Sequence, residues 1–374
     1  MMRYISEFRN QDLARRLAQR IERIASTIKR QVRLMEVCGT HAMSILKFGI
    51  KEIIPSNVKL VSGPGCPVCV TPESYIDLAC LYMKEGFLIA TFGDMVKVPG
   101  SNTSLAEEKS KGGKLSVVYS PVDALKLAKK LPEEKVVFLA IGFETTSPAV
   151  AATVLAAKEE NVENFTILCG HKLIPPAMKA LVENPEVKID GFICPGHVSA
   201  IVGSRAYEFL AKDYNIPCVV AGFEPLDILQ AINLLLSQIS SQRAGVENEY
   251  RRVVTEEGNL RAKELMEMVF EKTDSEWRGM GEIKESGLCV SSDFSFFDAQ
   301  CRFPLEVPSF RKDKKTGCLC GEVLQGLVEP EDCPLFKNYC TPLTPFGPCM
   351  VSVEGACNVH YRFGCKGEKV GAGN

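Results

Sequence analysis

Cysteine is the residue type that gives this chain most of its chemical potential. The sequence has 16 cysteines in 374 residues, and nine of them lie from Cys289 onward. The N-terminal residues lack the continuous apolar centre of a secretion signal, so we expect the chain to stay in the reducing cytoplasm. A disulfide framework is improbable there, and cysteines more often bind metals or exchange electrons. The sequence therefore predicts metal or thiol redox chemistry.

Two short motifs place cysteines where they could react. In Cys38-Gly-Thr-His41 the thiol lies where a helix is expected to start, and the helix dipole there favours the thiolate. His41 could act as a second ligand, a proton carrier or an N-cap partner. Cys66-Pro-Val-Cys69 has the spacing of a redox dithiol and of half a zinc knuckle. Since no matching pair follows nearby, dithiol or soft-metal chemistry is favoured over structural zinc.

The late cysteines have the composition of a second site. Four of them are separated by 14, 6 and 16 residues in a Pro-rich region: Cys318, Cys333, Cys340 and Cys357. Four thiolates can hold a [4Fe-4S] cluster or a tetrahedral zinc, and ligand number alone does not decide between them. Cys320 and Cys349 could form a dithiol or disulfide beside this site. No spacing assigns Cys289, Cys301 and Cys365.

The elements that must position these residues have the rhythm of βα units. Short apolar runs recur every 21 to 29 residues, and helix-like stretches follow most of them, which predicts parallel sheets and an α/β fold. The runs begin near Arg33, Val58, Phe87, Leu115, Val136, Phe165, Ile189 and Pro217.

The predicted strands divide into two sets of four on either side of a Pro- and Lys-rich passage at residues 120–135. We therefore predict two Rossmann-like α/β domains, at residues 1–121 and 122–245, with one parallel sheet each. Residues 246–374 are expected to hold a helical connection and then a Cys-rich domain, which starts near Met280 and is organised around a metal site. At the other end, apolar steps of three and four within residues 1–30 predict an amphipathic helix docked on the protein body.

The turns after the predicted strands hold most of the other reactive side chains. Ligands of open parallel sheets bind at the carboxyl ends of the strands, where these turns meet. We therefore expect one cleft to collect three of the four histidines, five cysteines and one glutamate: His41, His171, His197, Cys38, Cys66, Cys69, Cys169, Cys194 and Glu144. No phosphate-binding loop motif is present, so a nucleotide cofactor is not indicated.

Charge and hydropathy exclude two classes of partner. With 44 basic and 46 acidic residues, the chain has no overall basic field to hold a nucleic acid. The longest apolar runs are far shorter than the roughly 18 residues that a membrane helix needs. We expect neither a nucleic acid partner nor a membrane span.

Taken together, the motifs resemble those of the HypD family of [NiFe]-hydrogenase maturation factors over residues 32–362. The resemblance rests on the Cys38 and Cys66 motifs, Gly142-Phe-Glu-Thr-Thr, Pro195-Gly-His197 and the spacing of the four late cysteines. It implies an iron–sulfur protein that, with the small chaperone HypC, carries iron while its cyanide and carbon monoxide ligands are installed, giving an Fe(CN)2CO group. Cyanide is implied to arrive from HypE with HypF, and the finished group then goes to the hydrogenase large-subunit precursor.

The resemblance also implies a role for each cysteine that matches a family motif. Cys38 would bind the iron together with a cysteine of HypC, with His41 as its neighbour. Cys66 and Cys69 would be the dithiol of the cleft, while Cys320 and Cys349 would relay electrons to it by thiol–disulfide exchange. The ligands of the [4Fe-4S] cluster would be Cys318, Cys333, Cys340 and Cys357. Such a chain would be an accessory cluster-assembly and redox protein rather than a conventional enzyme.

Two other interpretations use the same residues. A ferredoxin-type disulfide reductase would use an iron–sulfur cluster only to reduce Cys66 and Cys69. An interaction protein would instead hold structural zinc at its late cysteines. Metal analysis separates the zinc protein from the other two, and infrared bands of iron-bound cyanide and carbon monoxide separate the scaffold from the reductase.

Overall fold

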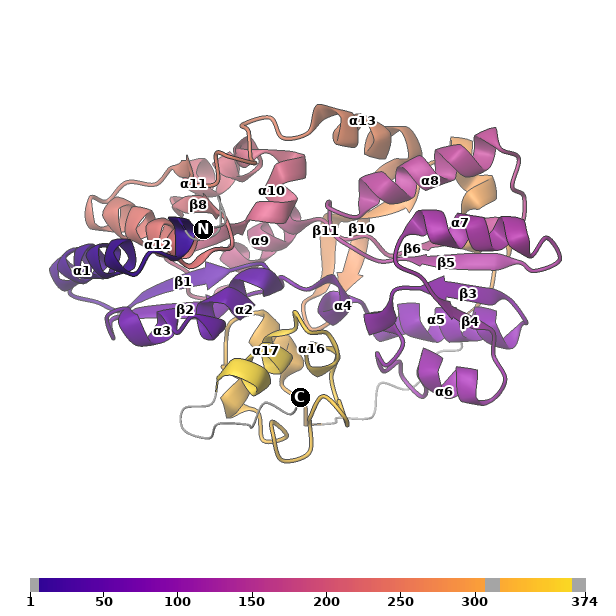
Figure 1. Ribbon diagram of the computed structural model, residues 1–374, viewed down its shortest axis with the longest axis horizontal. Coiled ribbons are helices and arrows are strands. Elements are labelled where there is room, and N and C mark those ends of the chain that lie inside the picture. The colour runs from indigo at the N-terminus through magenta and orange to yellow at the C-terminus, as the bar shows by residue number, and fades with distance from the viewer. Residues whose placement is uncertain (1–6, 307–316, 365–374) are drawn as a thin grey trace.

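The computed structural model describes residues 7–306 and 317–364, which form two parallel sheets and a Cys-rich C-terminal region (Figure 1). The predicted α/β class is confirmed. Each of the eight apolar runs forms a strand: β1 (Val32–Glu36), β2 (Val58–Ser62), β3 (Leu88–Thr91), β4 (Leu115–Val117), β5 (Val136–Ala140), β6 (Phe165–Cys169), β7 (Gly191–Pro195) and β8 (Cys218–Ala221).

The two sheets do not follow the order of the chain. One sheet has the order β2-β1-β7-β8-β9, where β9 is Val246–Asn248, and the other has the order β4-β3-β5-β6. The expectation of one four-stranded sheet in each half of the chain is therefore wrong, and a boundary after residue 121 falls between two strands of the same sheet. Strands buried on both faces all read as similar apolar runs, so their pattern does not reveal which strands pair.

Helices cover the faces of both sheets (Figure 1). In the four-stranded sheet, α7 (Pro121–Lys130) and α8 (Ser147–Glu159) lie on one face, and α5 (Glu73–Lys84) and α6 (Leu105–Ser110) lie on the other. The remaining helices of the two sheet regions are α2 (Gly39–Lys47), α3 (Ile50–Ile53), α4 (Pro67–Val70), α9 (Ile174–Glu183), α10 (Gly196–Val202), α11 (Glu208–Tyr214), α12 (Pro225–Ser240) and α13 (Leu260–Val269).

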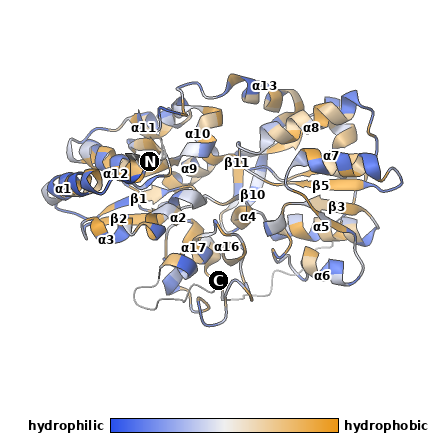
Figure 2. Cartoon of the chain, viewed as in Figure 1, coloured by the Kyte–Doolittle hydropathy of each residue, from blue (hydrophilic) through white to orange (hydrophobic). Residues whose placement is uncertain are grey.

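The strands form the centre of the apolar core, which Figure 2 shows as hydrophobic residues gathered along them. Every residue of β5 and β7 is buried.

Residues at the start of a helix beside the sheets satisfy its free backbone N–H groups. The Ser120 side chain accepts a hydrogen bond from Asp123 N, and Pro121 fills the first position of α7, where a backbone N–H would have no helical partner.

The N-terminal helix α1 (Gln11–Thr27) docks on the protein body, as its apolar spacing predicted. The Asn10 side chain caps it by accepting hydrogen bonds from the backbone of Asp12 and Leu13. Its inner face packs against α12, where Ile21 and Ala25 are completely buried. Among the described residues, no helix combines the length and the apolar character that crossing a membrane requires.

A β-hairpin joins the sheets to the C-terminal region, and the sequence did not predict it. Its strands are β10 (Phe270–Trp277) and β11 (Gly281–Val290). Half of the residues of β10 are charged, so its strand period is hidden. The α-helices described in the Cys-rich region beyond are short, as expected of chain organised around a site: α14 (Ala299–Arg302), α15 (Cys320–Leu324), α16 (Pro348–Val351) and α17 (Ala356–Phe363).

We predict that Ile21→Ala destabilises the protein by about 2–5 kcal/mol, because it removes a fully buried side chain between α1 and α12. Denaturant unfolding of the two variants measures this loss. Leu13→Ala on the same helix is the control, since Leu13 is 45% exposed and its loss should change stability little. Equal losses in both variants would contradict docking through the Ile21 face.

Candidate functional site

Cys38 lies in the turn between β1 and α2, and the turn at Gly65 packs against it. Its backbone N–H donates to Glu36 Oε2 at 2.8 Å, and the next N–H, from Gly39, donates to Gly65 O at 3.1 Å. A Cβ atom at Gly65 would lie 2.2 Å from the backbone nitrogen of Cys38. Only glycine permits this approach, which places the turn before Cys66 directly on Cys38.

Burial determines the charge state of the Cys38 thiol. Desolvation, followed by the nearby Glu354 carboxylate, raises the pKa of Cys38 to about 12. The expectation that the helix N-terminus makes this residue a thiolate is therefore wrong, because burial outweighs the helix dipole. An arriving metal cation would reverse this balance by stabilising the thiolate.

His41 is a neutral base one helical turn beyond Cys38. Its Nε2 lies 3.2 Å from Ala221 O and 3.0 Å from Gly222 O. Carbonyl oxygens only accept hydrogen bonds, so Nε2 carries the ring proton and Nδ1 keeps a lone pair. Burial lowers the pKa of His41 to about 4, and Nδ1 has no hydrogen-bond partner in the described part of the chain. The ring therefore offers a free acceptor atom.

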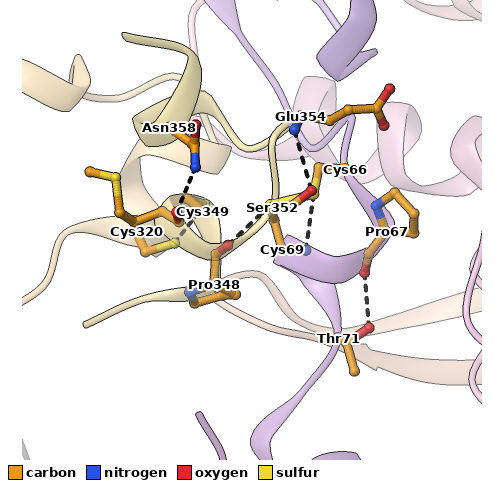
Figure 3. Close-up of a disulfide and its surroundings, with 11 residues drawn as sticks. Cys66, Pro67, Cys69, Thr71, Cys320, Pro348, Cys349, Ser352, Glu354 and Asn358 are labelled. Atoms are coloured by element: carbon orange, nitrogen blue, oxygen red, sulfur yellow. Dashed lines mark hydrogen bonds between the residues drawn. A yellow bond between two sulfur atoms is a disulfide. The ribbon is translucent and has the colours of Figure 1, made fainter. Parts of the chain in front are cut away.

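Cys66 and Cys69 form a buried disulfide beside the turn that carries Cys38 (Figure 3). Cys66 precedes α4, whose first residue is Pro67, and its Sγ accepts a hydrogen bond from Cys69 N at 3.2 Å. Cys69 Sγ also lies 3.8 Å from Pro348 O of the C-terminal region. The C-x-x-C pair thus forms the bond that its spacing permits, and it contacts the domain that carries the late cysteines.

A loop of the C-terminal region closes over the start of α2. Thr40 Oγ1 donates to Glu354 Oε1 at 2.7 Å, and a Cβ atom at Gly39 would lie 2.2 Å from Glu354 O. The glycine of the Cys38 motif is therefore needed for this backbone contact. Glu354, which the spacing of the cysteines did not assign, is the carboxylate that faces Cys38.

Further turns of the five-stranded sheet complete this side of the cleft. The ring of His197 stacks on Phe223 with a centroid distance of 4.1 Å, and Phe223 lies 4.9 Å from the ring of His41. Because β1, β2, β7 and β8 belong to one parallel sheet, the turns that follow them share one edge. This part of the predicted convergence is confirmed.

The turns of the four-stranded sheet lie elsewhere, so the single cleft expected for all of them is wrong. Glu144 Oε1 accepts a hydrogen bond from Ile174 N at 3.0 Å, at the start of α9. His171 packs against Phe270 of the hairpin at 5.5 Å, and Cys169 Sγ donates to the carbonyl oxygen of Leu288 at 3.1 Å. The last cysteine of the predicted set, Cys194, belongs to the five-stranded sheet and is completely buried within β7.

The late cysteines meet in one small space, as their spacing predicted. It is lined by Cys318, Cys320, Cys333, Cys340, Cys349 and Cys357, with Phe336, Gly347 and Met350. The Sγ atoms of Cys320 and Cys349 are 2.6 Å apart, and Cys340 Sγ accepts a hydrogen bond from Phe346 N at 3.3 Å. Four thiols with apolar neighbours fit the donor set of an iron–sulfur cluster, and the Cys320–Cys349 pair lies beside them.

A charged cluster near this region is a further group that the sequence did not reveal. Ligand atoms of Glu329, Glu331 and His360 lie within 4.8 Å of one another. Lys51 Nζ and Lys59 Nζ approach the Glu329 carboxylate at 3.3 and 3.4 Å. Since these lysines balance the charge of the Glu329 carboxylate, the cluster needs no cation. It acts as an ionic contact between the C-terminal region and the region of the five-stranded sheet.

The parallel sheets, the buried thiol beside a disulfide and the six-cysteine pocket define a cysteine-rich α/β protein. The chain belongs to the HypD family, since a family model described as "HypD: Hydrogenase formation hypA family" matches residues 12–364. It is 46% identical over 372 residues to "Hydrogenase maturation factor HypD" of Cupriavidus necator, covering 97% of each chain. It is 44% identical over 369 residues to the protein of the same name from Escherichia coli, covering 97% of this chain and 98% of that protein.

We predict that Glu144→Gln reduces the loss of stability on raising the pH. Burial raises the pKa of Glu144 from 4.5 to about 7, so the unfolded chain loses its proton first. The stability that the neutral carboxyl contributes is present below pH 4.5 and is lost as the pH rises through 7, by about 3 kcal/mol. Thermal midpoints at pH 5 and pH 8 test this. The exposed Glu282→Gln is the control, and an unchanged pH dependence in Glu144→Gln would contradict the prediction.

Proposed function

We propose that this chain acts in hydrogenase maturation as a scaffold on which Cys38 binds iron while cyanide and carbon monoxide are installed. Its partners would be HypC, HypE with HypF as the cyanide donor and, through HypC, the hydrogenase large-subunit precursor. The observation that carries this proposal is the enclosure of the Cys38 thiol between the Gly65 turn and the Glu354 loop, next to a disulfide. Membership of the HypD family supports hydrogenase maturation as the process that this geometry serves.

The chemistry of the cleft suits iron as a cargo. A thiolate is the soft donor that low-spin iron with cyanide and carbon monoxide requires, and burial protects such a group from oxygen. Cys38 is a neutral thiol before iron arrives, so binding must release its proton. His41 Nδ1, which has no hydrogen-bond partner among the described residues, supports a role for this ring as a transient carrier of that proton, since a ring with a pKa of about 4 does not retain it.

The C-terminal cysteines would supply electrons to the cleft. Cys318, Cys333, Cys340 and Cys357 would hold a [4Fe-4S] cluster, which supplies single electrons when it is bound. The Sγ atoms of Cys320 and Cys349 lie 2.6 Å apart, so these two residues support the role of an exchanging pair that closes a disulfide once one of them has attacked.

Thiol–disulfide exchange would pass these electrons on. A thiolate of the Cys320–Cys349 pair attacks the Cys66–Cys69 disulfide, and its S–S bond opens as a mixed disulfide forms. The second thiolate of the attacking pair then closes a new disulfide and releases Cys66 and Cys69. Two electrons have moved to the cleft beside Cys38, and two protons from solvent convert the released thiolates to thiols. The Cys320–Cys349 disulfide would in turn regain two electrons, one at a time, from the cluster when it is bound. The contact between Cys69 and Pro348, the neighbour of Cys349, supports this route.

We predict that Cys38→Ala abolishes the infrared bands of iron-bound cyanide and carbon monoxide while four-iron absorbance persists. Its thiol is the proposed iron ligand and does not line the pocket of late cysteines. The measurement is an infrared spectrum of anaerobic protein co-purified with HypC. Cys333→Ala is the matched control and should lose the four-iron absorbance first. Bands of normal intensity in Cys38→Ala would remove the scaffold role and leave the ferredoxin-type disulfide reductase as the better interpretation.

We predict that Cys66→Ser and Cys69→Ser each block hydrogenase maturation with little change in iron content. Either change removes the disulfide that the proposed exchange must open. Maturation is measured as hydrogenase activity in cells that carry each variant, and iron content and thermal midpoint are measured on the purified protein. Normal maturation in either variant, or loss of stability in both before any loss of function, would leave the disulfide with a structural role only.

A further inference from the structure

The turn of the β10–β11 hairpin contacts the chain beside each of the two cysteine pairs of the proposed relay, and Figure 1 shows the hairpin reaching toward α4. We call residues 277–281 the hairpin turn. On one side Arg278 N donates to Val70 O at 2.8 Å, one residue beyond Cys69. On the other side the turn contacts α15, which begins at Cys320. A single turn therefore touches the chain beside both pairs.

The contact with α15 is made by two glycines. A Cβ atom at Gly279 would lie 2.4 Å from Gly321 Cα, and a Cβ atom at Gly321 would lie 2.9 Å from Gly279 Cα. Gln325 of the segment after α15 adds a hydrogen bond from its Nε2 to Gly279 O at 2.8 Å. The backbone of the turn therefore lies against the residue that follows Cys320.

The Arg278 side chain adds contacts to the chain that follows the first pair. Its guanidinium donates to Glu73 Oε1 at 2.6 Å and to Pro99 O at 3.1 Å, and only 15% of the side chain is exposed. Glu73 starts α5, directly after the segment that carries Cys66 and Cys69. An arginine that donates to two segments fixes the turn relative to both.

The turn itself is held in place by Trp277. This side chain is completely buried, its Nε1 donates to Ser286 Oγ at 2.8 Å, and its ring stacks on Phe143 at 6.0 Å. These contacts hold the start of the hairpin turn against β11 and against the turn that follows β5.

We propose that the hairpin turn is a positioning element for thiol–disulfide exchange, which sets the distance between the Cys66–Cys69 and Cys320–Cys349 pairs. The inference rests on the proposed relay. Exchange requires one sulfur to approach another along a defined direction, so a small displacement of either pair slows it. The turn reacts with nothing itself, and its effect is confined to the rate at which the two pairs exchange.

Two glycines of the turn provide a matched pair of variants. Gly279 and Gly281 both have a φ of +79°, so an alanine strains the backbone equally at either position. Gly279 contacts Gly321, whereas a Cβ atom at Gly281 would meet no atom within 4 Å. Gly279→Ala therefore displaces α15, and Gly281→Ala is the control for backbone strain alone. Gly321→Ala produces the same clash from the other side, at a position where φ is not positive.

The experiment follows reduction of Cys66–Cys69 in anaerobic protein that contains its cluster. Dithionite reduces the cluster, and alkylation with mass spectrometry then measures the free thiols of Cys66 and Cys69 over time. We expect exchange to slow about 10- to 100-fold in Gly279→Ala and in Gly321→Ala, but to stay within about twofold in Gly281→Ala. Four-iron absorbance, and direct reduction of the disulfide by a phosphine, are expected to match the unchanged protein in all three variants.

Two results would overturn this inference, and they differ in what else they refute. If Gly279→Ala and Gly321→Ala exchange as fast as Gly281→Ala, the hairpin turn does not position the pairs, and the relay itself stands. If dithionite fails to reduce Cys66–Cys69 in the unchanged protein, the relay is refuted together with the positioning role.

Discussion

Close backbone packing around Cys38 is the constraint on which the rest of the site depends. The turn at Gly65 and the loop at Glu354 both approach α2 at distances that a side chain at Gly65 or Gly39 would prevent. This packing removes the Cys38 thiol from water, and burial then keeps it neutral. In the proposed function, iron would therefore gain a thiolate ligand only as it displaces the Cys38 proton.

The order of the strands explains why these segments meet. Pairing of β1 with β7, and of β7 with β8, brings the turns at His197 and Phe223 next to the turn at Cys38. With β1 and β2 in one sheet and β3 to β6 in the other, the chain crosses between the two sheets twice. The cleft therefore requires residues from both ends of the α/β region, and neither half of the chain can form it alone.

The sequence predicts the local features of this protein better than its long-range ones. Apolar runs locate all eight predicted strands, because each run is short and continuous in the sequence. The spacing of the late cysteines likewise predicts that Cys318 and Cys357 share one pocket. Sheet membership and the separation of Glu144 from Cys38 depend on strand pairing, which similar buried runs do not encode visibly. The pKa of Cys38 escaped prediction for a related reason, since it depends first on burial by packed segments and then on Glu354, more than 300 residues away in the chain.

One segment of the C-terminal region lies beside both cysteine pairs and Cys38. Within residues 348–355, Pro348 O lies beside Cys69 and Cys349 pairs with Cys320 (Figure 3). Glu354 of the same segment faces Cys38. The segment turns back on itself at Gly355, where a Cβ atom would lie 2.2 Å from Cys349 O. A displacement at any of these contacts must therefore shift the others. Such coupling is what a protein needs if the delivery of electrons is to be tied to the presence of a cargo at its thiol.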